Sequence, residues 1–261
     1  MSAADDKQTI LVQSKNGVMY VEINRPEKKN AITQAMYAAL ADAFEQAESD
    51  TAVRVVLLSG CEACFTSGND LGDFLNNPPA DDSHPVFRFL MAMATVQKPI
   101  VAAVNGPAVG VGTTLLLHCD LVYADRSAQF QLPFVNLALC PEAASSLLLP
   151  QQVGYARAAE LLLLGEPFDA DKALAYGLIN AICTADELMA RAQSSALRIA
   201  AQPPTAVRLT KRLLKQSNQA AVRERIVEEG KHFLEQLQSP EAKEALQAFF
   251  EHRKPDFSRF G

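Results

Sequence analysis

The stretch IVAAVNGPAVGVG, residues 100–112, joins an apolar, β-branched run to a loop with three glycines. The run at 100–104 predicts a buried strand, and the apolar residues after the loop predict a helix that continues to His118. An earlier unit has the same order, with a strand at 53–58 and a glycine-containing loop at 61–71. Strands that alternate with helices pair in parallel through right-handed crossovers. The two units therefore predict an α/β fold.

The N-terminal segment predicts a hairpin followed by a capped helix. Apolar, β-branched stretches at 9–15 and 18–24 flank Asn16-Gly17, which is a strong hairpin turn signal. From Thr33 to Ser49 the apolar residues recur at helical spacing, and the Thr33 side chain can cap the first turn.

The remaining patterns divide the chain into a core and a helical C-terminal part. A third buried strand is expected at 121–124, and the prolines between 76 and 85 predict a surface loop. Beyond Pro141 the strand signal nearly vanishes, and helices are expected at 142–149, 155–164, 170–176, 185–201, 206–216 and 220–252, with a break near Ser239-Pro240. The predicted organisation is a core at residues 1–200 and a C-terminal helical region at 201–261.

Composition and charge exclude several classes of protein. A chain of 261 residues can bury a sizeable core, but no run approaches the roughly 20 apolar residues of a membrane span. The net charge of −6 argues against nucleic acid as a partner. The five cysteines have no metal-ligand spacing, so no metal site is expected. Residues 1–8 lack a secretory signal pattern and residues 258–261 lack a peroxisomal signal, so the cytoplasm is the expected compartment.

The two glycine loops form the first candidate site. Each loop leads from a strand into a helix, where unpaired N–H groups and the helix dipole favour negative charge. Neighbouring strands would direct both helix starts at one place, which suits a phosphate or an oxyanion. The phosphate-binding patterns G-x-x-x-x-G-K-[ST] and G-x-G-x-x-G are absent, so we reject a nucleotide site. Glycines that only turn tight corners remain the alternative for either loop by itself.

Several segments together resemble the crotonase superfamily of enoyl-CoA hydratases and isomerases. The resemblance rests on segments whose order and spacing extend over nearly the whole chain: Asn30-Ala31, residues 67–71, residues 98–106, Cys119-Asp120, residues 173–179 and residues 249–253. The resemblance implies a crotonase-like β-β-α spiral core with a helical C-terminal trimerisation region. A homotrimer or a dimer of trimers is therefore expected.

The same resemblance implies how the site binds an acyl-coenzyme A thioester. The backbone N–H groups of Asn69 and Val111 would form an oxyanion hole for the thioester carbonyl. Val111 occupies the position of a frequent glycine, which preserves the hole unless a positive φ is required there. The residues expected to cradle coenzyme A are Ala31, Ser67, Gly68, Asp70, Leu71 and Gly110. Coenzyme A is then part of the substrate, and no separate cofactor is expected.

The choice of reaction depends on three positions in the resemblance. Thr114 and Phe134 stand where hydratases of the superfamily carry two glutamates, so hydration by that mechanism is not expected. Glu142 lies in Cys140-Pro141-Glu142-Ala143, which resembles the corresponding segment of the peroxisomal-type 3,2-enoyl-CoA isomerases. Cys140 and Ala143 replace a usual Ser and Gly. The resemblance thus implies an isomerase that converts 3-enoyl-CoA to trans-2-enoyl-CoA with Glu142 as acid and base.

Alternatives to this interpretation remain at Glu142. Without context, an acid after Pro141 is an ordinary residue of a first helical turn, stabilised by the helix dipole. As a base it would have a pKa raised by an apolar environment, expected from Phe134, Leu137, Leu139 and Leu147. The same carboxylate can serve an acyl-CoA hydratase or thioester hydrolase by activating water. A non-catalytic acyl-CoA binding protein is the third alternative.

Other residues are assigned structural roles. His118 lies on an apolar helix and is expected to be a satisfied core residue. An apolar stripe of Phe87, Phe89, Leu90 and Met93 is expected to be core rather than the lining of an acyl tunnel. The basic residues Arg208, Lys211, Arg212 and Lys215 recur at helical spacing and predict a solvated face.

Overall fold

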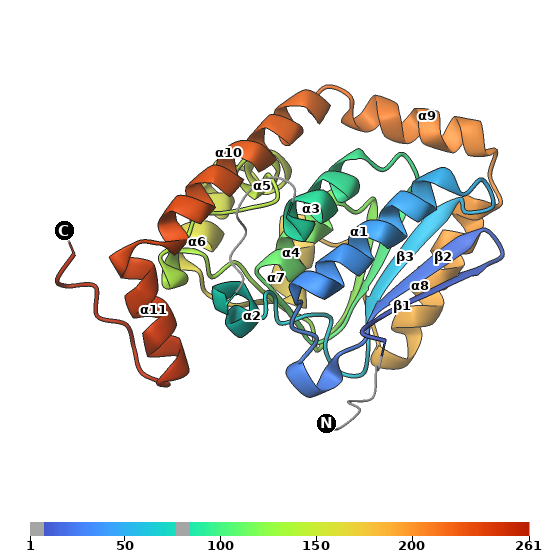
Figure 1. The fold of residues 1–261 in the computed structure, drawn as a ribbon. Helices are drawn as coiled ribbons and strands as arrows, with labels where there is room; N and C mark the ends of the chain where they lie inside the picture. Colours follow the sequence, from blue (N-terminus) through green and yellow to red (C-terminus); the bar gives the residue numbers. More distant parts are fainter. Residues whose placement is uncertain (1–7, 77–83, 261) are drawn as a thin grey trace, which may run out of the picture.

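The computed structural model describes residues 8–76 and 84–260 and has a six-stranded sheet at its centre (Figure 1). The strands of this sheet, in spatial order, are β1 (Ile10–Lys15), β2 (Val18–Ile23), β3 (Val55–Gly60), β4 (Ile100–Val104), β6 (Leu121–Asp125) and β9 (Ala181–Cys183). The β1–β2 hairpin is antiparallel and every other pairing is parallel. The α/β class predicted from the two strand–loop–helix units is confirmed.

Alternate residues of the central strands face two helical layers. Val55 and Leu57 of β3 pack with Val101 of β4 against α8 (Ala185–Ala200). Val56 and Leu58 face the main core instead, which α1 (Gln34–Ser49) and α3 (Pro85–Thr95) cover. Figure 1 shows α1 and α3 on one side of the sheet and α8 behind it. This alternation explains the continuous apolar runs, because strands covered on both faces need them.

A second, smaller sheet lies next to the ends of the central strands. It contains β5 (Pro107–Val109), β7 (Gln129–Gln131) and β8 (Phe168–Asp169) in the order β5-β7-β8. Two single bridges, Ile32 with Asn69 and Thr66 with Ala108, continue the pairing across the loops that follow β3 and β4. The loops are thereby held side by side.

The remaining helices surround these sheets and extend the chain away from the core. Their bounds are η1 (Pro26–Lys28), α2 (Leu71–Asn76), α4 (Val111–Thr114), η2 (Leu115–His118), η3 (Val135–Leu137), α5 (Ser145–Val153), α6 (Tyr155–Leu164), α7 (Ala170–Tyr176), α9 (Pro204–Lys215), α10 (Gln219–Leu237) and α11 (Pro240–Phe250). In Figure 1, α9 and α10 cross the top of the molecule and α11 turns back from the end of α10, where it contacts η3. Across the described ranges, none of the helices combines the length and apolarity of a membrane span.

Most predicted elements of the chain are confirmed. The hairpin forms, the Thr33 hydroxyl accepts the Met36 N–H at the start of α1, and the long C-terminal helix breaks at Ser239. Residues 77–83 of the predicted surface loop lie outside the described part of the chain.

Four predictions about secondary structure were wrong. The loop after β4 contains the short strand β5, and β8 and β9 lie beyond Pro141, where almost no strand was expected. These strands have two or three residues each, and tertiary pairing rather than local pattern defines them. The predicted helix to His118 is divided into α4 and η2. The predicted helix at 142–149 begins only at Ser145, so Glu142 precedes it.

Candidate active site

Two loops from neighbouring strands build the site. β3 and β4 are adjacent and parallel, so the loops that follow them leave the same edge of the sheet. Thr66 N donates to Pro107 O at 2.9 Å, and Val109 N donates to Thr66 O at 3.0 Å. A Cβ on Gly112 would lie 2.6 Å from Thr66 Cγ2, so the helix after the second loop can approach the first loop only because residue 112 is glycine. The predicted meeting of the two glycine loops is confirmed.

The backbone around Asn69 directs its N–H group away from the chain segment that it pairs with. Ile32 N donates to Gly68 O at 2.8 Å, and Asp70 N donates to Ile32 O at 2.9 Å. In this parallel bridge the bonded groups belong to the residues on either side of Asn69, the carbonyl of Gly68 and the N–H of Asp70, so the N–H of Asn69 itself points to the other side. The Asn69 side chain is fixed by the Tyr37 hydroxyl, which donates to its Oδ1 at 2.5 Å.

Val111 is the first residue of α4. The N–H groups of Thr113 and Thr114 both donate to Gly110 O, whereas the first N–H of a helix has no intrahelical acceptor. The positive φ in this loop falls on Gly110, at 56°, and not on Val111. A valine at 111 is therefore compatible with the backbone that places its N–H at the helix start.

These loops line a cleft of about 700 Å³. Asn69 and Val111 contribute to its wall, and so do the residues predicted to cradle coenzyme A: Ala31, Ser67, Gly68, Asp70, Leu71 and Gly110. Arg25 Nη1 donates a hydrogen bond to Asp70 Oδ2 at 2.7 Å. This contact with the Arg25 guanidinium lowers the pKa of the Asp70 carboxyl group, against the effect of burial. The structure thus brings together the loop residues that the sequence singled out.

Glu142 lies next to this cleft, in a cavity of about 30 Å³. The cavity and the cleft share Asn69, Phe74 and Phe233 as lining residues. Glu142 is 9% exposed, and the Thr114 hydroxyl donates a hydrogen bond to its Oε1. Burial raises the pKa of Glu142 to about 8, an effect that the Thr114 hydrogen bond opposes and the charge of Glu229 reinforces. Such a group can take up and return a proton near neutral pH.

Two expectations about Glu142 need correction. It is not in the first turn of a helix, because Ala143 and Ala144 adopt positive φ and α5 starts after them. Its apolar surroundings are also different from those expected. Phe134, Leu137 and Leu139 line the large cleft instead. The apolar residues around the small cavity are Phe74, Val86, Phe87, Leu90, Ile226, Phe233 and Leu234.

The structure shows where the apolar stripe on α3, His118 and Lys211 lie, and only some of the expected roles hold. Phe89 and Met93 are core residues as expected, but Phe87 and Leu90 line the cavity at Glu142. His118 is a buried core residue as expected. Its Nε2 lies 2.8 Å from Ala143 O, and burial lowers its pKa to about 4. Lys211, expected on a solvated face, is buried and donates to Asp120 Oδ2 at 2.8 Å.

Three residues near the site were missed by the sequence analysis. Tyr37 anchors Asn69 and lines the cavity of Glu142, and Glu229 on α10 accepts hydrogen bonds from the backbone next to Glu142. Glu229 follows Val222 by seven residues and Ile226 by three, so the helical pattern places it on the buried face of α10. A glutamate at a buried position of a predicted helix was the signal in the sequence that could have identified Glu229.

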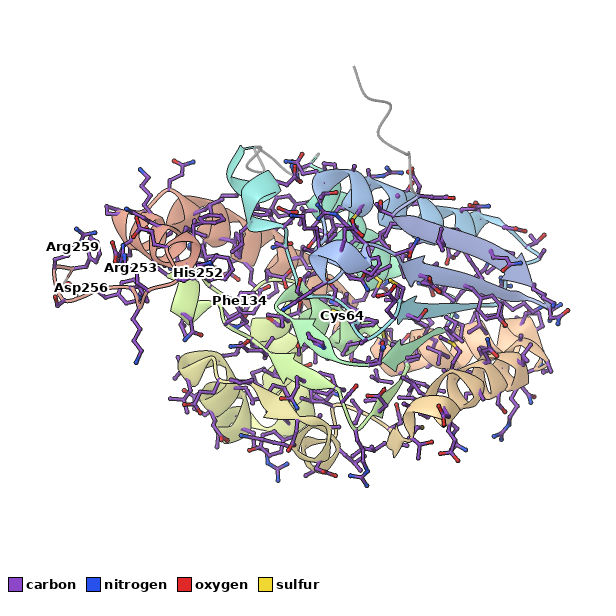
Figure 2. The ribbon with its side chains drawn as sticks, turned by 90° about the horizontal axis from the view of Figure 1, so that it is seen from below. Cys64, Phe134, His252, Arg253, Asp256 and Arg259 are labelled. Atoms are coloured by element: carbon purple, nitrogen blue, oxygen red, sulfur yellow. The ribbon has the colours of Figure 1, made fainter. Side chains whose placement is uncertain are left out.

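The third missed residue, Arg253, belongs to the C-terminal segment, which closes one side of the cleft. Phe249, Phe250 and Arg253 line the same cleft as the glycine loops. In Figure 2, Phe134 lies between the C-terminal segment with Arg253 and the part of the core that contains Cys64. Arg253 Nη1 also pairs with Glu244 Oε1 at 2.5 Å, which fixes the guanidinium at this wall.

Comparisons with known proteins agree with this site. The family model described as enoyl-CoA hydratase/isomerase matches residues 13–259. The chain is 35% identical over 256 residues to 1,2-epoxyphenylacetyl-CoA isomerase of Escherichia coli, with 95% of this chain and 98% of the relative covered. It is 36% identical to enoyl-CoA delta isomerase 2 of Rattus norvegicus over 220 residues, which cover 82% of this chain and 56% of that protein.

A solved structure supports the same family. The crystal structure of an enoyl-CoA hydratase/isomerase from Pseudoalteromonas atlantica superposes with a TM-score of 0.92 at 46% identity, covering 96% of this chain and all of that chain (100%). Curated relatives include hydratases as well as isomerases. The chain therefore belongs to the enoyl-CoA hydratase/isomerase family, the crotonase superfamily, and is an enzyme of that family.

Proposed function

We propose that this enzyme converts a 3-enoyl-CoA to the trans-2-enoyl-CoA, with Glu142 as both base and acid. The observation that carries the proposal is the environment of Glu142. It is a buried carboxyl group with a pKa of about 8, next to a cleft lined by Asn69 and Val111, whose backbone N–H groups are the proposed donors. Thr114 contacts Glu142 as a hydroxyl rather than as a second carboxylate, and Phe134 supplies an apolar wall.

The reaction begins when the thioester oxygen binds between the N–H groups of Asn69 and Val111. This contact acidifies C2, because the negative charge of the dienolate collects on an oxygen that two fixed donors stabilise. Glu142 takes the proton from C2 as the dienolate forms. The same carboxyl group then delivers a proton to C4, which moves the double bond to the C2–C3 position. The number of atoms is unchanged, and the mechanism calls on no metal and no redox cofactor.

The cleft supports binding of the coenzyme A part by contacts along its rim. Ala31 and residues 67–71 would hold the adenine and the pantetheine on the loop side. Lys28, Lys29 and Arg253 are cations at the cleft wall that can face phosphate groups. The acyl chain would then extend past Asn69 toward Glu142.

Exclusion of water favours isomerisation over hydration. Apolar side chains form most of the lining of the cavity at Glu142. A dienolate is safer from side reactions when water is absent, whereas hydration needs water beside C3. Among the described residues that line the cleft and the cavity, Glu142 is the only glutamate, and the one aspartate, Asp70, is paired with Arg25.

A pair of specificity constants tests the proposal. Isomerisation of 3-hexenoyl-CoA is followed by the gain of absorbance of the conjugated thioester, and hydration of trans-2-hexenoyl-CoA by its loss. We expect kcat/KM for isomerisation to exceed that for hydration by about two orders of magnitude or more, the scale of one missing acid–base group. Comparable values, or a larger value for hydration, would favour the hydratase alternative. Release of free coenzyme A would instead point to thioester hydrolysis, and binding without turnover to a non-catalytic protein.

A further inference from the structure

The backbone that follows Glu142 has an unusual conformation. Ala143 and Ala144 both have positive φ, 58° and 57°, although neither is glycine. A left-handed conformation is unfavourable for a residue with a Cβ, so two in succession persist only where the surroundings hold them. This segment connects the carboxyl group at 142 to α5.

The peptide group between Ala143 and Ala144 is held from both sides. Its carbonyl oxygen lies 2.8 Å from His118 Nε2, and its N–H donates to Glu229 Oε2 at 2.6 Å. The other carboxylate oxygen of Glu229, Oε1, accepts the Ser146 N–H at 2.9 Å. Glu229 therefore binds two N–H groups at the start of α5 with one carboxylate, in the manner of a helix cap supplied by another helix.

Glu229 is well placed to keep this geometry constant. It is 6% exposed on the buried face of α10, where burial raises the pKa of its carboxyl group. The Ser146 side chain, the two accepted N–H bonds and the charge of Arg225 oppose that shift. Arg225 Nη1 donates to Ser146 Oγ at 3.0 Å, so α10 contacts the same turn twice.

We propose that Glu229 is a positioning residue that acts through Glu142, because it fixes the peptide group one residue after the base and places a second carboxylate behind it. The proposal rests on the role of Glu142 as base. Glu229 itself is not among the residues that line the cleft or the small cavity in the described part of the chain, and both its oxygens accept backbone N–H groups. It therefore does not compete for the substrate proton.

The charge of Glu229 has a second effect on Glu142. A carboxylate nearby disfavours ionisation of its neighbour, and Glu229 contributes to the raised pKa of Glu142. The other ionisable groups around Glu142 are Tyr37 on α1, Cys140 in the preceding loop, and His118 behind Ala143. Burial raises the pKa of Tyr37 and Cys140 and lowers that of His118, so all three are neutral at neutral pH.

Glu229→Gln tests the proposal, with Glu235→Gln as the matched control on the exposed side of the same helix. Glutamine keeps the length of the side chain but removes its charge and turns one acceptor into a donor that faces an N–H group. We expect kcat to fall about 10- to 100-fold with KM changed less than about threefold, since misplacement of a catalytic group by about 1 Å costs that much. Glu235→Gln should retain both constants.

The ionisation of Glu142 is measured independently of turnover. Carboxyl ¹³C NMR titrations are recorded for wild type and Glu229→Gln, and the Glu142 signal is assigned by its loss in Glu142→Gln. We expect the Glu142 midpoint to move to lower pH in Glu229→Gln. An unchanged midpoint would overturn the proposal. If the midpoint shifts in Glu229→Gln but the wild-type protein does not isomerise 3-enoyl-CoA, the proposed function is contradicted and the positioning role of Glu229 is not.

The variant Glu229→Asp distinguishes the effect of the side-chain charge from the effect of the side-chain length. Aspartate keeps the charge but is one methylene too short to accept both N–H groups. We expect a Glu142 midpoint near that of wild type with kcat lowered by about threefold or more. If Glu229→Gln does not fold, Glu229→Asp is the test of the positioning role. A kcat for Glu229→Asp equal to that of wild type would refute this role.

Discussion

The hydroxyl of Thr114 donates a hydrogen bond to Oε1 of Glu142. Thr114 occupies a position where the superfamily resemblance places a hydratase glutamate, and here that position contacts the proposed base. A hydrogen bond to the carboxylate favours its charged form, so Thr114 limits the rise in pKa that burial causes. The two residues thus form one hydrogen-bonded pair of a hydroxyl and a carboxyl group rather than a pair of carboxylates.

Glu142→Gln should abolish isomerisation while acyl-CoA binding persists. The amide is nearly isosteric but cannot accept the C2 proton, and loss of a general base costs roughly 10²–10⁴-fold in rate. Turnover of 3-hexenoyl-CoA and the Kd of a saturated acyl-CoA measured by calorimetry report the two properties separately. Turnover close to that of wild type would exclude Glu142 as the base.

The pH dependence of kcat/KM should follow the ionisation of Glu142. The base must be deprotonated, so kcat/KM should rise with pH until about 8, the pKa to which burial raises Glu142, and then level off. An initial-rate profile from pH 5.5 to 9.5 with subsaturating 3-hexenoyl-CoA measures this limb. A profile that is flat between pH 6 and 8 would contradict it.

The same ionisation should make the folded state more sensitive to alkali. Native Glu142 keeps its proton up to about pH 8, whereas the unfolded chain releases it near the ordinary value of 4.5. The native state therefore binds more protons between these values, and the stability contribution of Glu142 falls as the pH rises through this window. Denaturant titrations of wild type and Glu142→Gln should converge at low pH, with wild type losing stability relative to the variant toward pH 8. A constant difference would argue against the raised pKa.

Thr114→Val should move the acidic limb of the rate profile to higher pH. Valine keeps the shape of the side chain but removes the only donor identified on the Glu142 carboxylate in the described residues, so ionisation becomes harder. Rates near pH 7 should fall several-fold, while rates above pH 9 should approach those of wild type. A uniform loss at every pH would mean that Thr114 shapes the site without tuning Glu142.

Gly106→Ala should destabilise the protein far more than Gly177→Ala. Both glycines have positive φ, at 58° and 77°. A Cβ at 177 meets nothing within 4 Å, so its cost is the conformational term of about 1–2 kcal/mol. A Cβ at 106 would lie 2.0 Å from Ala63 O, a backbone atom, which adds roughly 1–3 kcal/mol of overpacking. Urea unfolding compares the variants, and equal losses would contradict the steric argument.

The protein should form a trimer or a dimer of trimers in solution. Large apolar side chains are exposed on α6 and α9, including Leu163 at 68% and Leu214 at 78%. Exposed apolar surface of this kind marks interfaces between subunits. Light scattering at micromolar concentration should give three or six times the mass of 28.3 kDa. A monomer mass would refute this expectation.

The sequence predicted those elements whose signal is local. The hairpin at Asn16-Gly17, the cap at Thr33 and the two glycine loops could be read from residue type and spacing, and the structure contains them. The short strands β5, β8 and β9 could not, since two or three residues become a strand only through pairing with distant segments.

The candidate site was predictable in its loops and less so around its base. The two glycine loops follow from their places after two strands, and the resemblance to the superfamily implied Asn69 and Val111 as the donors within them. The partners of Glu142 come from segments distant in sequence, with Tyr37 on α1 and Glu229 on α10, and no local pattern joins them to residue 142. The left-handed backbone at Ala143 and Ala144 was hidden for the same reason, because alanine there gives no turn signal.

The proposed oxyanion hole uses backbone N–H groups, so it tolerates changes of the side chains at positions 69 and 111. Any amino acid except proline carries an N–H group, so replacement at position 69 or 111 leaves the proposed carbonyl contact in place as long as the loops keep their course. Side chains near position 142 can meanwhile change and redirect the fate of the enolate. In the proposed mechanism, activation of the thioester thus depends on the fold and the choice of product on side chains, which agrees with the mixture of hydratases and isomerases among the relatives.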